Sequence, residues 1–573
     1  MKPAEYRLRR RPALTSVNGV PSLLARVLSA RGVSGDSELD YALTRLAPVE
    51  ALTGLASAVE RLVLARERDE RVLVVGDFDA DGATSTALAL RGLRALGVRQ
   101  VDFLVPNRFE FGYGLTPEIV QVARMRDPGL IVTVDNGIAS IDGVAAANAA
   151  GIDVLITDHH LPGATLPAAV AIVNPNQPGD AFPSKALAGV GVVFYLLIAL
   201  RQALRARGCL GVDGVAAPNL AQWLDIVALG TVADVVPLDF NNRVLVEQGL
   251  RRIRSGRAVV GIQALLAVAN REVRHASAAD LGYAVGPRLN AAGRLEDMSL
   301  GIECLLTDDA EVARTLAARL DDLNRQRREI EADMQSQALE ILTGIDLDAA
   351  ELPWGLTLYG ADWHQGVIGI LASRIRERVH RPVIAFADAG DGQLKGSARS
   401  VPGLHIRDAL DWVATHYPGV ITRFGGHAMA AGLALESNQL ATFNAAFDQA
   451  VRTLLPEELL QPEVWSDGAL APDEMTVESA EMLTRAGPWG QAFPPPLFDG
   501  EFEVVQRRVL QERHLKYVLR PLRQSLALDA IIFNVAPSEW PGPGESMHIA
   551  FRLEVNRFND STTLQLMIQN RFG

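Results

Sequence analysis

The chain has 573 residues, a length that corresponds to about three or four domains of ordinary size. Its residues are 48% hydrophobic and 21% charged, as in soluble globular proteins that bury substantial cores. The formal net charge of −13 argues against a protein whose whole surface coats nucleic acid, although it leaves room for a local basic track.

The cysteines and the apolar segments predict a soluble, cytoplasmic protein with no membrane association. Cys209 and Cys304 have no metal-type spacing and indicate no disulfide framework, which fits a reducing compartment. The basic N-terminus, MKPAEYRLRRRPAL, is not followed by the apolar region of a secretory signal. The longest apolar run, residues 186–200, is short for a membrane span and predicts a buried helix.

The N-terminal segment, residues 1–50, is predicted to be helical. Pro21 and Ser22 are suited to open one helix, and a second is expected at 36–43. Its basic cluster consists of Arg7, Arg9, Arg10 and Arg11. Two interpretations of this cluster stay open: contacts to phosphate, or a solvated basic arm.

Strand-like and helix-like segments alternate from about residue 55 to 240, and this pattern predicts a doubly wound parallel sheet in a domain at 51–307. Thr116 and Pro117 are suited to the N-cap and first position of one helix. Helix-rich sequence follows from Leu187 to about residue 306. The expected strands are 72–75, 101–105, 130–134, 154–156 and 171–173.

Carboxylates and imidazoles follow several of these strands. Because the carboxyl ends of parallel strands meet at one edge of a sheet, where open α/β folds hold ligands, we expect these side chains to converge. Carboxylates so close together repel one another unless they are solvated, capped or share a cation. The residues are Asp77, Asp79, Asp81, Asp135, Asp158, His159, His160 and Asp234.

This donor set predicts a site for two divalent cations. Oxygen ligands with one or two imidazoles suit Mn²⁺ or Mg²⁺ and are compatible with Zn²⁺ or Co²⁺. Two ions about 4 Å apart support phosphoryl displacement. Any one of these aspartates alone is more often a cap or turn residue, and DFDADG alone resembles a calcium loop. The prediction therefore depends on the clusters taken together.

Three further regions follow. Residues 308–344 contain no proline and no internal glycine, and their apolar stripe predicts a helix of roughly 50 Å with a charged, solvated middle that connects two domains. Residues 345–456 repeat the α/β pattern, with strands near 356–359, 383–386, 393–398 and 428–434 and helices near 366–378, 406–417 and 437–454. A linker-like stretch at 456–467 leads into a turn-rich region, about 468–573, that predicts a small β-barrel or sandwich in a C-terminal domain at 457–573.

Several motifs, in chain order, resemble one family. VGDFDADG, VTVDNG, TDHH and GTVAD are similar to the four motifs of the DHH phosphoesterase superfamily. PNRFEFGYGL, LAGVGVVFYL and GPRLNAAGR resemble, within it, the RecJ single-strand-specific exonucleases. WHQGVIGI, GSARS and FGGHAMAAG resemble the accompanying DHHA1 domain, and GPWGQAFPPPLF resembles the start of an OB-type domain. The resemblance implies two α/β domains, DHH and DHHA1, joined by a long helix, plus a C-terminal OB-type barrel.

The resemblance also assigns roles at the sheet edge. It places metal ligands at Asp79, Asp81, Asp135, His159 and Asp234, with Asp77 also expected in the site and Asp135 as the bridge between ions. His160 is expected beside the scissile phosphate, as a donor to a phosphate oxygen or to the leaving group, or alternatively as a partner that orients a ligand. Asp158 is expected to support the loop.

Phosphate handling is expected from other side chains. Arginines in two motifs can make bidentate contacts, and glycines beside polar residues in the second α/β domain offer backbone amides for a terminal nucleotide, although tight packing explains those glycines equally well. His364 is either a site residue or a turn residue. The residues are Arg108, Arg288, Asn290, His364, Ser397, Arg399, Gly425, Gly426 and His427.

A basic track is predicted on the barrel. Basic residues interleaved with an aromatic residue suit single-stranded DNA, through phosphate neutralisation and base stacking, although a solvated barrel face is the alternative. The track consists of Arg507, Arg508, Arg513, Lys516, Tyr517, Arg520 and Arg523, with His514 among them.

The resulting hypothesis is a metal-dependent, 5′-to-3′ exonuclease that degrades single-stranded DNA to 5′-mononucleotides in recombination and repair. The polarity and the biological role are implied only by the resemblance. A narrow cleft between the two α/β domains is expected to exclude duplex. We expect a monomer that works with a single-strand-binding protein and a helicase. The rivals are a related phosphodiesterase of short oligonucleotides and a non-catalytic DNA-binding scaffold.

Overall fold

The computed structural model describes residues 6–106, 114–211, 216–344, 352–426, 428–558 and 561–572. The chain divides into two compact units, neither of which is continuous in sequence. Unit 1 consists of residues 1–34, 326–486 and 496–573, and unit 2 consists of residues 35–325 and 487–495.

Unit 2 is built on the predicted parallel sheet. Its strand order is β3-β2-β4-β5-β6, and each neighbouring pair is parallel. All residues of β2 and β4 are buried, as expected for apolar, β-branched strands covered on both faces. The strands are β2 (Val72–Gly76), β3 (Val101–Leu104), β4 (Leu130–Val134), β5 (Asp153–Thr157) and β6 (Ala171–Val173), which confirms the prediction.

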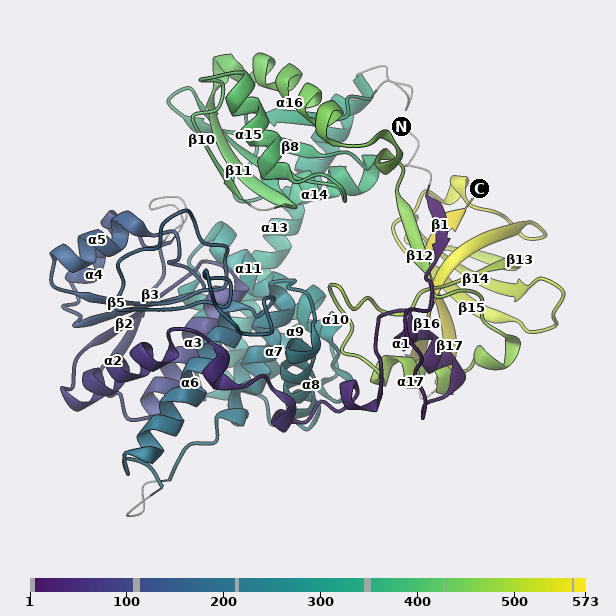
Figure 1. Ribbon diagram of the computed structural model, residues 1–573. Helices are drawn as coiled ribbons and strands as arrows, with labels where there is room; N and C mark the ends of the chain where they lie inside the picture. Colours follow the sequence, from purple (N-terminus) through teal and green to yellow (C-terminus); the bar gives the residue numbers. More distant parts are fainter. Residues whose placement is uncertain are drawn as a thin grey trace. The chain divides into compact units, whose positions relative to one another are not determined.

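Helices cover both faces of this sheet (Figure 1). The Thr116 hydroxyl caps α4 by accepting a bond from the amide of Ile119, with Pro117 at the first position, as predicted. α6 is long and apolar enough to cross a membrane by composition, but 61% of its apolar window is buried, as in a core helix. One face carries α2 (Leu55–Glu67), α3 (Ala80–Ala95) and α6 (Gly189–Ala206), and the other α4 (Pro117–Arg124) and α5 (Ile141–Ala149).

The rest of unit 2 is helical, as the sequence predicted. A π-helical turn at Leu281–Val285 precedes α11. The helices are α7 (Leu224–Ala233), α8 (Phe240–Arg254), α9 (Val260–Val268), α10 (Ala278–Asp280), α11 (Gly286–Leu295) and α12 (Ser299–Leu306).

The long helix α13 runs from Ala310 to Gly344, and it passes from unit 2 to unit 1 after Arg325. The expectation that its middle is wholly solvated is wrong. Arg327 and Glu331 are buried and form an ion pair at 2.6 Å, and Glu331 also accepts from Arg374 at 2.9 Å. These charges turn inward because the helix packs on the second α/β domain rather than only linking two domains.

That second domain, in unit 1, has a five-stranded sheet in the order β10-β11-β9-β8-β7, with β7 and β8 parallel and the other pairs antiparallel. β10 was not predicted, since its sequence, RFGG, has no apolar run. The strands are β7 (Leu356–Gly360), β8 (Val383–Gly390), β9 (Gln393–Arg399), β10 (Arg423–Gly426) and β11 (Ala430–Glu436).

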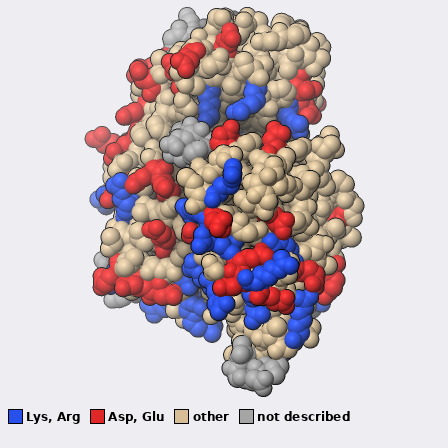
Figure 2. All heavy atoms as spheres, turned by 90° about the vertical axis from the view of Figure 1, so that its left-hand side faces the viewer, with Lys and Arg blue, Asp and Glu red and all other residues tan. Residues whose placement is uncertain are grey.

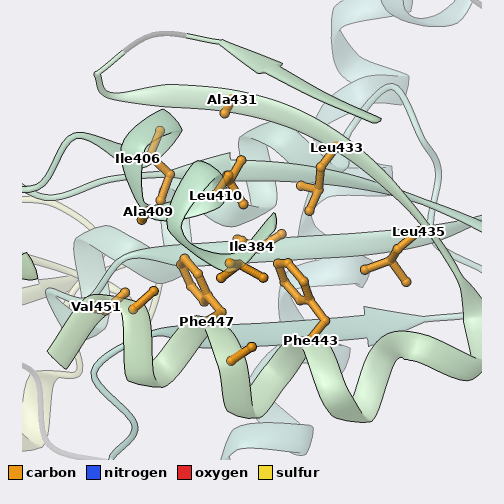
Figure 3. Packing of buried hydrophobic residues seen from close by; sticks show 14 of the residues in the cluster. Ile384, Ile406, Ala409, Leu410, Ala431, Leu433, Leu435, Phe443, Phe447 and Val451 are labelled. Carbon is orange, nitrogen blue, oxygen red and sulfur yellow. The ribbon is translucent and has the colours of Figure 1, made fainter. Parts of the chain in front are cut away.

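Helices pack on both faces of this sheet. Figure 3 shows Phe443 and Phe447 of α16 pointing toward the strands beside residues of α15, and these buried side chains form one core. On the opposite face, α14 and Met334 of α13 bury a second core. The helices are α14 (Ile368–Val379), α15 (Ile406–His416) and α16 (Leu440–Leu454).

The C-terminal region forms the predicted barrel, closed in the order β13-β14-β15-β17-β16. Only the β15–β17 pairing is parallel among these described strands. The short helix α17 (Val477–Arg485) precedes it. The strands are β13 (Phe498–Leu510), β14 (His514–Pro521), β15 (Leu528–Ile532), β16 (Ser546–Phe558) and β17 (Ser561–Phe572).

The N-terminal segment differs from its prediction. The helix at Ser22 is confirmed as α1 (Ser22–Ser29), but 36–43 holds short 3₁₀ turns instead of a helix. β1 (Arg7–Arg10) is a strand that pairs in parallel with β12 (Glu463–Ser466), in the stretch predicted to be a linker. Arg10 donates to Asp499 at 2.7 and 3.1 Å, so its charge is paired within the protein.

Candidate active site

The first part of the site is the turn between β2 and α3. The Asp79 carboxylate caps α3 by accepting from the amide of Gly82 at 3.0 Å. The Asp81 carboxylate accepts from the amides of Gly189 and Val190, at 2.6 and 3.0 Å, at the first turn of α6. A helix N-terminus stabilises a carboxylate in this position, so α6 holds Asp81 in one orientation.

The second part is Asp135, which follows β4. Its backbone is left-handed, with a φ of 62°, and its amide donates to the carbonyl of Thr157 at 3.0 Å. A Cβ built at Gly189 would lie 2.7 Å from both Cβ and Oδ1 of Asp135. Only glycine at position 189 therefore allows α6 to approach this carboxylate so closely.

The third part is the turn after β5. The Asp158 carboxylate accepts from the amides of His159 and His160 at 2.7 and 3.1 Å, and lies 2.7 Å from Nδ1 of His160. It also accepts from the amide of Ile138 at 2.9 Å. Asp158 is thus fully occupied in ordering the turn, in line with the supporting role expected for it.

These turns converge with Asp234, the residue that ends α7. Nε2 of His159 lies 3.1 Å from Oδ1 of Asp135 and 3.4 Å from Oδ2 of Asp234. Three sets have ligand atoms within 4.8 Å of one another. They are Asp77, Asp79 and Asp135; Asp81, His159 and Asp234; and Asp135, His159 and His160.

The electrostatics of this cluster favour a bound cation. Burial, with neighbouring carboxylates, raises the pKa of Asp81 to about 7 and raises the pKa values of Asp135 and Asp234 well above their ordinary range. Burial alone would lower the pKa of His160, but its bond to Asp158 outweighs this and raises that pKa to about 9. Buried carboxylates in mutual repulsion, with an imidazole among them, are a donor set that fits Mn²⁺ or Mg²⁺.

Two residues of GPRLNAAGR lie on α11. The Asn290 amide oxygen accepts from the amide of Ala80 at 2.8 Å, which ties α11 to the first aspartate turn. Arg288 is 8% exposed, and its guanidinium contacts Asp321 and the carbonyl of Ala284, each at 2.7 Å. Arg288 is therefore engaged by the protein rather than directed to solvent. Arg108 lies outside the described residues.

The residues predicted for a terminal nucleotide lie in unit 1. Ser397 of β9 is opposite Gly432 of β11, which is opposite Gly425 of β10, so these residues form a row across the sheet. Nη1 of Arg399 donates to Oγ of Ser397 at 3.1 Å. Nδ1 of His364 accepts from the amide of Gly366, in a turn. His427 lies outside the described residues.

Arg399 has an unusual environment. Burial lowers the pKa of its guanidinium to about 10, and the charge of Arg376 adds to the effect. Among the described residues, no carboxylate forms an ion pair with it. A Cβ at Gly369, in the first turn of α14, would lie 2.8 Å from Nη2 of Arg399 and 2.9 Å from Oγ of Ser397.

The barrel presents part of the predicted basic track. Arg508 and Arg513 are exposed, and Arg508 lies opposite Lys516 on adjacent strands. Lys516 pairs with Asp529 at 3.0 Å, and Arg520 with Glu503 at 3.3 Å. The Arg507 guanidinium instead donates to the carbonyls of Trp540 and Pro537.

The expectation that Tyr517 stacks on a base is wrong. Its side chain alternates into the barrel interior, where it is 1% exposed and donates to the carbonyl of Pro541. The outward aromatic residue is Phe533, which is 46% exposed and packs edge-on against His514. Sequence reasoning missed Phe533, although inward Leu528, Ala530 and Ile532 place it outside by alternation.

The surface charge is mixed elsewhere. On the face in Figure 2, Lys and Arg side chains lie among Asp and Glu side chains, in keeping with the net charge of −13. Two exposed apolar residues are not indicated by the sequence: Val235, directly after Asp234, and Tyr283, on the π-helical turn. A π-helical turn is often found at a functional site, but nothing in the local sequence predicts one.

Three family models match the chain in order: the DHH family, N-terminal domain, at residues 71–231; the DHHA1 domain at 354–453; and the RecJ OB domain at 466–570. The single-stranded-DNA-specific exonuclease RecJ of Escherichia coli (strain K12) is 54% identical over 552 residues, which cover 96% of each chain. The protein of the same name from Bacillus subtilis (strain 168) is 33% identical, over 97% of this chain and 69% of its own.

Solved structures agree with these sequence matches. The crystal structure of RecJ in complex with Mn²⁺ from Thermus thermophilus matches with a TM-score of 0.79 and 29% identity, over 99% of this chain and 80% of that one. The Mg²⁺ complex from the same organism matches with a TM-score of 0.73. The chain therefore belongs to the family of RecJ single-stranded-DNA-specific exonucleases.

Proposed function

We propose that this protein is a metal-dependent exonuclease that degrades single-stranded DNA from the 5′ end to 5′-mononucleotides, in DNA recombination and repair. The observation that carries the proposal is the convergence of five aspartates and His159 at the carboxyl edge of the parallel sheet. Carboxylates and imidazole in this arrangement suit a pair of divalent cations. Family membership supplies the substrate class and the polarity.

Two ions, Mn²⁺ or Mg²⁺, would be held by Asp77, Asp79, Asp81, Asp135, His159 and Asp234, with Asp135 shared between them. When bound, such ions lower the pKa of a water and stabilise the charge that develops on phosphate oxygens. Asp81 is oriented by α6 and His159 by its turn, so the donors are held in place before the ions bind.

His160 would act on the scissile phosphate. An imidazole N–H at this position could donate to a phosphate oxygen or to the leaving group. Asp158 contacts Nδ1 at 2.7 Å and so fixes the orientation of the imidazole ring. His160 would thus contact the phosphate, and Asp158 would orient His160.

Ser397 and Arg399 would bind the terminal phosphate, with Gly425 and Gly426 beside them. A guanidinium that has lost part of its hydration, and that no described carboxylate neutralises, favours an anionic ligand. Gly369 lets the first turn of α14 lie close to both residues, because a Cβ there would be 2.8 Å from Nη2 of Arg399 and 2.9 Å from Oγ of Ser397. Recognition of a terminal phosphate would explain attack from one end of the strand.

The barrel would guide the strand before it reaches the site. Arg508, Arg513 and Lys516 supply phosphate contacts, and Phe533 beside His514 supplies a surface for base stacking. Arg508 and Lys516 lie opposite each other on adjacent strands, and Lys516 is also within 3.0 Å of Asp529, so Arg508 and Arg513 would supply most of the phosphate contacts.

We further propose a cytoplasmic monomer that acts on strands delivered by a helicase and covered by a single-strand-binding protein. The rival hypotheses are less well supported. A phosphodiesterase of short oligonucleotides has no use for a strand-guiding barrel, and a non-catalytic scaffold has no use for a complete set of carboxylates.

The experiment is a digest of 5′-labelled and 3′-labelled single strands with Mn²⁺ or Mg²⁺ and with a chelator. We expect the 5′ label to be released first as a mononucleotide, and no release in chelator. Asp135→Asn should abolish release, while Asp127→Asn is the matched control, because Asp127 also has a left-handed φ, of 47°, where asparagine is tolerated. Wild-type turnover by Asp135→Asn would contradict the proposal.

A further inference from the structure

Residues 487–495, here called the 487–495 segment, belong to unit 2 although the chain on both sides of them belongs to unit 1. The segment folds into a tight turn, in which the amide of Gly490 donates to the carbonyl of Phe493 at 2.8 Å and the reverse bond is 3.2 Å. The carbonyl of Gln491 accepts from the amide of Leu238 at 2.8 Å. This backbone bond joins the segment to the loop after Asp234.

Phe493 anchors the segment in unit 2. Its side chain is 2% exposed, and the ring of Trp489 stacks on it with 5.0 Å between centroids and 13° between planes. The guanidinium of Arg243, on α8, lies 4.2 Å from the centroid of the Phe493 ring. A cation over an aromatic face, together with a buried ring, fixes the segment against α8.

The same arginine holds the loop from the other side. Nη1 of Arg243 donates to the carbonyl of Leu238 at 2.9 Å. The amide of Leu238 is thus bound by the 487–495 segment, and its carbonyl is bound by Arg243, on which Phe493 packs. A Cβ at Gly490 would lie 2.7 Å from Cδ1 of Leu238. The path of the chain at Leu238 therefore depends on the 487–495 segment.

Leu238 lies four residues after Asp234, in the loop that follows α7. Asp234 ends α7, and Val235 turns the chain out of the helix with a left-handed φ of 60°. The Asp234 side chain is 21% exposed, against 2% for Asp135, so the surrounding packing holds it less firmly. The amide of Asp234 donates to the carbonyl of Gly230 at 2.9 Å, and because helix ends fray unless they are tied down, the loop that continues to Leu238 is a second constraint on this end.

We propose that the 487–495 segment is a positioning element for Asp234, and that the C-terminal half of the chain thereby completes the metal site of unit 2. This inference rests on the proposed function, because it assumes that Asp234 binds a divalent cation. Phe493 is a positioning residue that touches neither the ions nor the DNA. Its removal alters Asp234 through Arg243 and Leu238.

The test uses the full-length protein and Mn²⁺ alone, with the affinity measured by calorimetric titration and the stability by thermal unfolding. Phe493→Leu keeps an apolar side chain but removes the ring under Arg243, and Gly490→Ala adds a Cβ against Leu238. Phe447→Leu is the matched control, since Phe447 is an equally buried phenylalanine in the core of unit 1 (Figure 3). We expect Phe493→Leu and Gly490→Ala to weaken Mn²⁺ binding about 10-fold, and Phe447→Leu to leave it unchanged.

Unchanged Mn²⁺ affinity in a folded Phe493→Leu or Gly490→Ala protein would overturn the inference, as would an equal loss in Phe447→Leu, which would indicate general destabilisation. If Phe493→Leu does not fold, Gly490→Ala decides the matter alone. Absence of Mn²⁺ binding by the wild-type protein would contradict the proposed function itself. The two failures are therefore distinguishable.

Discussion

At the scale of single residues, the aspartate site depends on a glycine, which has no side chain, as well as on the aspartates themselves. Gly189 has no side chain, and this lets the first turn of α6 donate two amides to Asp81 while it lies against Asp135. Asp135 itself adopts a left-handed φ of 62°, a conformation that non-glycine residues rarely adopt. The aspartates are obvious in the sequence, whereas this glycine is recognisable only from the contacts around it.

We expect Gly189→Ala to reduce hydrolysis of single strands about 100-fold, because a displacement of about 1 Å at a reacting centre costs that much. The added Cβ would lie 2.7 Å from Asp135, so the carboxylate or the helix has to move. Gly191→Ala is the control on the same helix, because its added Cβ would meet Leu187, at 2.5 Å from Cδ1 and 2.9 Å from Cγ, rather than an aspartate of the site. Steady-state rates at saturating Mn²⁺ provide the measurement, and equal rates for the two variants would rule out this role for Gly189.

A second residue-scale prediction concerns Arg399. If this guanidinium binds the terminal phosphate, Arg399→Gln should remove the preference for 5′-phosphorylated over 5′-hydroxyl strands. Stability should change by less than about 1 kcal/mol, because a poorly solvated cation is removed along with its bonds to Ser397 and Ala398. Competition between the two labelled substrates measures the preference, and its persistence in Arg399→Gln would place the phosphate elsewhere.

At the scale of secondary-structure elements, partners distant in sequence decide two assignments. β1 pairs with β12 across more than four hundred residues, and Arg9 and Arg10 form ion pairs with Glu463 and Asp499. Arg31, after α1, makes a two-bond contact with buried Asp467 at 2.8 and 3.0 Å. The N-terminal segment is thus a structural part of unit 1, and the phosphate-contact interpretation of its arginines loses support.

The Arg10–Asp499 contact predicts a pH-dependent contribution to stability. Burial would raise the pKa of Asp499, but the bonds from Arg10 and Ser466 outweigh it and lower that pKa. A lowered pKa means that the contribution is complete above the ordinary carboxyl value, about 3.8, and is lost as the pH falls through the lower folded value. Asp499→Asn should therefore lower the free energy of unfolding by about 1 to 2 kcal/mol at pH 7.

The difference in free energy of unfolding between the wild type and Asp499→Asn should become smaller as the pH approaches 3. Urea unfolding at pH 7, 5, 4 and 3 measures it, with Glu463→Gln as a control because its pair with Arg9 is largely solvated. If this difference stays constant down to pH 3, the packing of the Asp499 side chain, and not its charge, stabilises the fold.

At the scale of the whole molecule, the protein has a negative net charge, so its contacts with negatively charged DNA depend on the basic residues that are not in ion pairs. Many arginines of the described chain form ion pairs, as Arg61 does with Glu70 and Asp153, and these have little charge left for DNA. Arg508 and Arg513 on the barrel are exposed instead. Affinity for the strand should therefore depend on a few side chains and on salt.

The slope of log affinity against log salt is negative, and each phosphate contact on a single strand contributes about 0.7 to its magnitude. Replacing Arg508, Arg513 and Lys516 together by glutamine should therefore reduce the magnitude of the slope by about 2. The slope is measured by fluorescence anisotropy with a labelled oligonucleotide at salt concentrations between roughly 50 and 300 mM. Arg485→Gln is the control, since Arg485 is exposed but paired with Glu481. An unchanged slope in the triple variant would locate the DNA on another surface.

The sequence by itself determined the five parallel strands, the long helix, the barrel and the convergence of the aspartates on one edge, because each depends on local patterns of apolar residues, turns and carboxylates. Only the tertiary structure decided the rest. β1, the 487–495 segment and the buried charges of α13 all depend on partners far away in the chain. Such partners leave no periodicity in the residues that meet them, since pairing and burial are satisfied across space and not along the sequence.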